Sequence, residues 1–198
     1  LCTGIEAIQA ALGVVNIEIE VEILGITEPS NCAVDTVIDL YGNIAEDAPA
    51  TVPKLADCES ASDSSEDWGT AVAIVADNKP WKEDGIKMII PISDEAPICG
   101  NPLEASDSHG MASINPFVAT MGVLVYPISA TGTPADVIEL AKNMAETTGG
   151  IWNETTAPEE DLILHILGGV FDACGKQGGD CNSNNIPDSC DIEAGTAT

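Results

Sequence analysis

The chain has 198 residues, and its 33 acidic residues against only six lysines and no arginine give a net charge of −27 at pH 7. Such a surface repels nucleic acid and anionic membranes, which leaves cations as natural partners. A hydrophobic content of 44% excludes a disordered acidic tail and predicts a folded core. No apolar run approaches the roughly 18 residues of a membrane span, so no membrane insertion is predicted.

The first third of the chain predicts a helix, a half-exposed strand and a polar insertion. Apolar residues recur at helical spacing at Leu1, Ile5, Ile8 and Leu12. This pattern opens the chain without an initiator methionine, so we expect the sequence to be an internal part of a longer product. Alternating apolar and acidic residues predict a strand over 16–27. The polar insertion covers about 28–66, with an edge strand over 36–41.

The rest of the chain alternates strands with helices. The predicted strands are 85–94, 122–128 and 150–153, and the predicted helices are 69–77, 112–121, 135–147 and 159–173. Val and Ile are frequent in 69–77, so propensity alone would also allow a strand there. The continuous apolar run in 85–94 is typical of a strand buried on both faces. This alternation predicts an α/β fold with a parallel sheet covered on both faces.

Two polar segments fall at the carboxyl ends of the strands, where open parallel sheets bind ligands. They are 66–70, which opens a helix, and 93–95, which ends the central strand. The order of helix, strand, Gly-Thr turn and hydrophobic strand ending in Ser-Asp-Glu resembles a von Willebrand factor type A (vWA) domain over roughly 1–173. The resemblance implies a Rossmann-like, doubly wound, mostly parallel sheet flanked by helices.

In that family, a divalent cation is held by an Asp-x-Ser-x-Ser motif, a threonine and an aspartate. The resemblance implies that Thr70 and Asp94 are the second and third of these elements. The cation would be Mg²⁺ or another divalent ion, with one coordination position left for an acidic group of a protein partner. Taken singly, Thr70 is also an ordinary helix-start hydroxyl and Asp94 an ordinary strand-end cap.

The Asp-x-Ser-x-Ser motif is absent from the sequence, and family members carry it just before the helix in which Leu1 lies. The cation site therefore lacks one of its three ligand sets in this chain. Two interpretations stay open. Either the central strand that bears the motif precedes these residues in the mature protein, or another chain inserts a strand into the gap.

The segment 180–191 has the spacing of a calcium-binding loop. Oxygen-bearing side chains occupy positions 1, 3, 5, 9 and 12, with a backbone carbonyl at position 7; these are Asp180, Asn182, Asn184, Asp188, Asp191 and Ile186. The loop resembles thrombospondin type 3 and dockerin-like repeats, which implies bound Ca²⁺; a solvated turn is the alternative. We therefore predict a vWA-like domain at 1–175 and a calcium-binding repeat at 176–198, the first of a series.

Seven cysteines, none in a Cys-x-x-Cys pair, indicate disulfides rather than a metal site, and hence an extracellular, secreted or cell-surface protein. Cys32 and Cys58 lie near the two ends of the polar insertion and could close it, while Cys181 and Cys190 are the second and eleventh residues of the calcium loop and could staple it. The pairing cannot be deduced from the sequence. Asn153 opens an Asn-Glu-Thr sequon and is a candidate for glycosylation.

No motif for catalysis is found, since the chain has no Gly-x-Ser-x-Gly, no phosphate loop and no useful Cys/His combination. The sequence therefore favours a non-enzymatic, cation-dependent adhesion or protein-binding module. The alternative is a structural subunit of an extracellular filament or surface layer that packs against copies of itself. The expected partners are a protein ligand or further copies of the chain.

Overall fold

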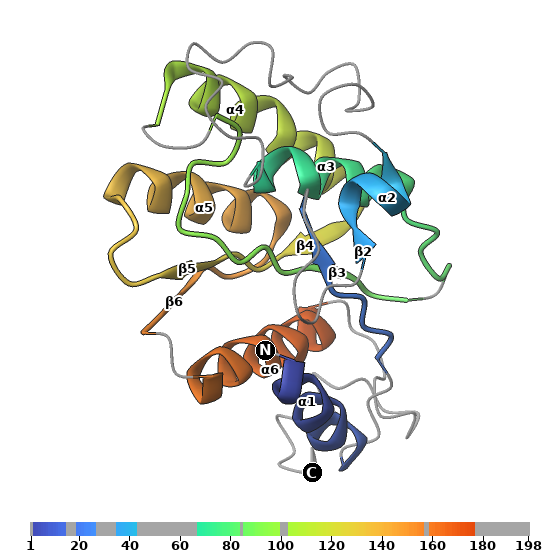
Figure 1. Cartoon of the computed structure of the whole chain (residues 1–198). Coiled ribbons are helices and arrows are strands. Elements are labelled where there is room, and N and C mark those ends of the chain that lie inside the picture. Colours follow the sequence, from blue (N-terminus) through green and yellow to red (C-terminus); the bar gives the residue numbers. More distant parts are fainter. Residues whose placement is uncertain are drawn as a thin grey trace. The chain divides into compact units, whose positions relative to one another are not determined.

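The computed structural model describes residues 2–14, 19–26, 35–42, 67–83, 85–99, 103–156 and 159–176. The chain divides into two compact units, one formed by 1–22 with 157–198 and the other by 23–156. The described part is a mixture of helices and short parallel strand pairs (Figure 1). The predicted α/β class is therefore confirmed at this coarse level.

The first unit contains helices α1 (Cys2–Val14) and α6 (Glu159–Lys176), which pack against each other. Ile8 and Leu12, both from the predicted apolar stripe, are buried on α1. Val170, Ala173 and Cys174 are buried on α6. The two helices predicted at 1–12 and 159–173 are thus confirmed, because each has an apolar stripe that a second helix can cover.

The second unit is built on parallel strands. Strand β3 (Lys87–Ile89) pairs with β4 (Val123–Val125), and β5 (Ile128–Ala130) pairs with β6 (Asn153–Thr155). An isolated parallel bridge between Ile92 and Ile128 extends the β3 side. The segment 123–130 therefore lies between the other two strands and is interrupted at Tyr126 and Pro127. A third parallel pair is formed by β1 (Leu24–Gly25) and β2 (Asp35–Thr36).

Helices α3 (Trp68–Asn78), α4 (Ala105–Thr120) and α5 (Ala135–Thr148) lie on one side of strands β3 to β6 (Figure 1). Both α4 and α5 pack on β4, and α3 packs on α4. Alternation along β4 directs Val123 and Val125 into this core, where both are fully buried. The core fixes α3 and α5 relative to the strand ends and so determines which side chains can meet there.

The predicted edge strand at 36–41 is wrong, because only Asp35–Thr36 is a strand and α2 (Val37–Tyr41) follows. The hydroxyl of Thr36 accepts a hydrogen bond from the backbone N–H of Asp39 at 3.1 Å and donates one to its carboxylate at 2.8 Å. This N-cap starts a helix where the Val and Ile content favours a strand. Gly42 ends the helix with a φ of 125°.

The predicted strands are longer than those observed. Of the described residues 19–26, 19–23 are irregular and only Leu24–Gly25 pairs, because a strand needs a partner as well as a pattern. The residues of β3 are half-buried rather than buried on both faces, and Ile92 is 43% exposed. In the described part of the chain, β3 has a strand on one side only. The last predicted strand lies at 153–155 instead of 150–153.

The helices in this unit follow the sequence more closely. The predicted helices 69–77 and 135–147 are confirmed within one residue at each end, whereas 112–121 begins earlier, at Ala105. The earlier start comes from an acidic capping box in which Glu104 accepts from the N–H of Asp107 and Asp107 accepts from the N–H of Glu104.

Candidate functional site

The chain that leaves β3 is held against the first turn of α3. The indole N–H of Trp68 donates to the carbonyl of Glu95 at 3.0 Å, and the N–H of Gly69 donates to the carbonyl of Pro97 at 2.8 Å. The N–H of Glu95 in turn donates to the hydroxyl of Ser93 at 3.1 Å. Asp94 therefore lies on a short segment that is tied directly to the start of α3.

Gly69 allows the backbone of the loop after β3 to come close to the first turn of α3. A Cβ at this position would lie 2.8 Å from Sδ of Met111 and 2.9 Å from the carbonyl oxygen of Pro97. Real Cβ atoms essentially never come so close, and a backbone carbonyl cannot move aside as a flexible side chain does. The glycine of the Gly-Thr turn thus serves a close contact between backbones.

Asp107 organises the other end of the same loop. One carboxylate oxygen accepts the backbone N–H groups of Ile98 and Cys99, both at 2.9 Å, and the other accepts the N–H of Glu104 at 2.8 Å. The residue is fully buried. We did not predict this role from the sequence. The only local signal is the acidic pair at 104 and 107, which differs from the usual Ser/Thr-x-x-Glu capping box.

The two predicted cation ligands occupy different environments. Thr70, in the first turn of α3, is only 1% exposed, and its hydroxyl oxygen has no hydrogen-bond partner in the described part of the chain. Asp94 is exposed. Asp67, the N-cap residue of α3, is fully buried and does not cap the helix with its side chain. The described residues contain no group of three or more Asp, Glu, His or Cys side chains arranged to hold a metal.

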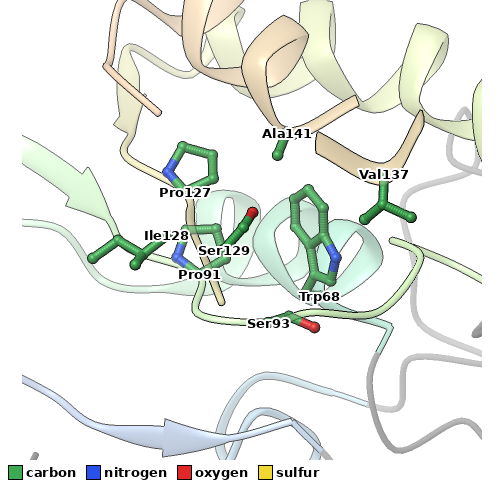
Figure 2. A pocket seen from close by; sticks show the side chains of 8 residues that line it. All are labelled: Trp68, Pro91, Ser93, Pro127, Ile128, Ser129, Val137 and Ala141. Carbon is green, nitrogen blue, oxygen red and sulfur yellow. The ribbon is translucent and has the colours of Figure 1, made fainter. Parts of the chain in front are cut away.

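A small recess lies next to these segments, between the residues that follow β3 and the start of β5 (Figure 2). It is lined by Trp68, Pro91, Ser93, Pro127, Ile128, Ser129, Val137 and Ala141. Its free volume of about 10 Å³ is comparable to the roughly 10–15 Å³ needed for one water molecule. The hydroxyl of Ser129 already accepts the indole N–H of Trp152 at 3.0 Å. The recess therefore has no room for an organic substrate.

Most of the other predicted site residues lie outside the part of the chain that the structure describes. The calcium-loop residues Asp180, Asn182, Asn184, Ile186, Asp188 and Asp191, and the disulfide candidates Cys32, Cys58, Cys181 and Cys190, all lie outside the described residues. Asn153 is half-buried at the start of β6, and its backbone N–H donates to Pro127 at 3.0 Å.

Two cysteines that were not singled out in the sequence, Cys99 and Cys174, are each disulfide-bonded. Both are buried, with 1% and 5% of their surface exposed. The cysteine content of the sequence predicts disulfides in general but not which cysteines pair, because cysteine spacing does not determine connectivity.

Comparison with protein-family models, curated proteins and solved structures finds no match for the chain. None of the helices in the described residues has the length and apolar character needed to cross a membrane.

Proposed function

We propose that the chain is a non-enzymatic, extracellular protein-binding module of the vWA kind, whose contact with its partner depends on a divalent cation. The observation that carries this proposal is the buried hydroxyl of Thr70, which has no hydrogen-bond partner among the described residues. Burying a hydroxyl in this state costs about 1–3 kcal/mol. Coordination of a cation at the Thr70 oxygen would offset that cost.

The donor set suits a magnesium-type ion, which takes one or two carboxylates, hydroxyls and retained water. Thr70 would supply a hydroxyl oxygen, and Asp67 and Asp94 would supply carboxylates, from two segments joined by the hydrogen bonds of Trp68 and Gly69. A partner's carboxylate would complete the coordination shell. A cation is needed for such a contact because a chain with a net charge of −27 otherwise repels an acidic partner.

The extracellular location is supported by the disulfides of Cys99 and Cys174, since disulfides persist mainly in oxidising compartments. The loop 180–191 would bind Ca²⁺ and stabilise the C-terminal repeat as a spacer. Its acidic and amide oxygens at alternating positions are the basis for this part of the proposal.

Replacing Thr70 with valine tests the cation site, because valine keeps the volume and removes the hydroxyl. In EDTA, we expect Thr70→Val to raise the free energy of unfolding by about 1 kcal/mol, since the unsatisfied hydroxyl is gone. In MgCl₂, the wild type should gain stability and the variant should not. The measurement is urea unfolding followed by tryptophan fluorescence, with and without the metal.

The matched control is Thr133→Val. Thr133 is also buried, but its hydroxyl donates to the carbonyl of Ala130 at 2.7 Å, so the variant should lose stability equally in both solutions. An equal response of wild type and Thr70→Val to MgCl₂ would exclude Thr70 as a ligand.

Capture of a peptide carrying a single aspartate tests the binding role. Capture should require Mg²⁺ and should be lost in both Thr70→Val and Asp94→Asn. Asp77→Asn, which neutralises an exposed carboxylate at the other end of α3, should retain it. Loss of assembly on chelation without any peptide capture would instead favour the structural-subunit alternative.

A further inference from the structure

In the part of the chain that the structure describes, one edge of the β3 segment carries backbone groups with no hydrogen bond. The opposite edge is paired: the N–H groups of Tyr126 and Ile128 donate to the carbonyls of Ile89 and Pro91, both at 2.9 Å, and the N–H of Ser93 donates to Ile128 at 3.2 Å. The backbone N–H and C=O groups of the odd-numbered residues in this segment therefore point toward strand 123–130. In a parallel ladder, the even-numbered residues direct their N–H and C=O groups to the other side.

The outer edge consists of the backbone groups of Met88, Ile90 and Ile92. In the described part of the chain, none of these groups forms a hydrogen bond. Native proteins usually protect such an edge with charge or proline. Here neither protects it, because the missing N–H of Pro91 lies on the paired side and the three edge residues are uncharged.

We propose that the outer edge pairs with the same edge of a second copy of the chain, in antiparallel orientation about a twofold axis through Ile90. In this register Ile90 lies opposite Ile90, and Met88 lies opposite Ile92. Each of these is a hydrogen-bonded position of an antiparallel ladder, so all the outward N–H and C=O groups find partners. The pairing itself requires no cation, although the segment ends at Asp94, one of the proposed cation ligands. It takes the interpretation in which another chain, rather than a preceding segment, supplies a strand to this sheet.

Charge favours a second copy as the occupant. Residues 86–93 contain one lysine and no acid, although the chain as a whole carries a net charge of −27. Two copies can therefore approach here with less repulsion than over the average surface. The proposed register places Lys87 of one copy opposite Ser93 of the other, beside the acidic pair Asp94 and Glu95 that ends the segment. The segment is thus complementary to itself in charge.

Hydrophobic burial adds to the pairing. Ile92 is 43% exposed, while Met88 and Ile90 are half-buried. A paired strand covers such side chains with the cross-strand neighbours of the other copy. Because the two patches are identical and related by a twofold axis, the contact closes into a dimer and does not propagate into a filament.

Single cysteines test the register. In a hydrogen-bonded antiparallel pair the Cα atoms lie about 5.5 Å apart, within the range that a disulfide accepts. Ile90→Cys should therefore form a covalent dimer on mild oxidation, read by non-reducing electrophoresis against the unmodified chain. Ile92→Cys alone should not, because residue 92 faces residue 88. A mixture of Ile92→Cys with Met88→Cys should cross-link.

Proline at the edge tests the hydrogen bonds. Ile90→Pro removes an outward N–H and no bond to strand 123–130, so it should weaken dimer association at least about tenfold in sedimentation equilibrium. Ile90→Val keeps the N–H and should retain the dimer. A monomeric wild type at about 100 µM without cross-linking of Ile90→Cys would overturn the proposal. Self-linkage of Ile92→Cys would also overturn it, and that readout holds if the proline variant fails to fold.

Discussion

A single buried carboxylate holds the loop that carries Asp94 in shape. Asp107 accepts three backbone N–H groups, so Asp107→Asn must turn an amide NH₂ toward at least one donor. We expect the variant to lose about 2–3 kcal/mol of unfolding free energy, because a buried charge-assisted acceptor is replaced by a mismatched one. The shift of the urea midpoint measures this loss.

Asp77→Asn is the control for that loss, since Asp77 is exposed near the end of α3 and its carboxylate makes no hydrogen bond in the described residues. Its effect should stay within about 0.5 kcal/mol. If the two variants unfold at the same urea concentration, the three hydrogen bonds that the Asp107 carboxylate accepts do not contribute to stability.

The residues of the candidate site could be predicted from the sequence only where a local pattern marked them. Thr70 and Asp94 became candidates through the resemblance to a vWA domain, which rests on the Gly-Thr turn and the strand that ends in Ser-Asp-Glu, and their role as ligands stays a prediction. Asp107 does not follow, because its role depends on the approach of Ile98 and Cys99, which no local periodicity encodes. The burial of Thr70 is likewise a product of packing rather than of its own sequence neighbourhood.

The attachment of α3 to the loop after β3 depends on the absence of one methyl group. Gly69→Ala would push Cβ against the carbonyl of Pro97 and separate the helix from the loop. We expect a loss of about 1–3 kcal/mol, as for other overpacked sites. Any stabilisation by Mg²⁺ should fall with it, because Thr70 and Asp94 lie on the two segments that separate. Thermal unfolding with and without MgCl₂ measures both effects.

Gly168→Ala provides the comparison within a helix. Apart from its chain neighbours and the nearby backbone of α6 itself, nothing lies within 4 Å of a Cβ at Gly168, so alanine should stabilise this helix by about 0.5–1 kcal/mol. Equal effects at Gly69 and Gly168 would mean that helix propensity alone matters and that the contact with Pro97 does not.

Elements with their own local signals were predictable, whereas elements that depend on partners were not. The 3.6-residue period of apolar residues predicted α1, α5 and α6 correctly, because an amphipathic pattern can be recognised from the local sequence alone. The length of a strand depends on how much of a neighbouring strand lies alongside it. For this reason the observed strands are shorter than those predicted at 16–27 and 85–94. At 36–41 the N-cap formed by Thr36 prevailed over β propensity.

At the scale of the whole molecule, the net charge of −27 should make stability depend on salt. Self-repulsion destabilises a compact anionic chain, and added ions screen it. We expect NaCl to raise the melting temperature, and CaCl₂ at equal ionic strength to raise it further if the loop 180–191 binds the ion. A site saturated at 100 times its Kd contributes about 2.7 kcal/mol, which corresponds to roughly 5–10 °C for a domain of this size.

Neutralising Asp188 and Asp191, two of the predicted calcium ligands, separates specific binding of Ca²⁺ from screening by ions in general. Asp188→Asn with Asp191→Asn should abolish the additional effect of CaCl₂ and leave the effect of NaCl in place, because screening does not depend on two particular charges. Asp77→Asn with Glu146→Gln removes the same charge from exposed helix positions and should leave both effects unchanged. If both double variants respond to CaCl₂ like the wild type, the calcium effect is screening by the whole acidic surface, because the loop ligands then contribute nothing specific.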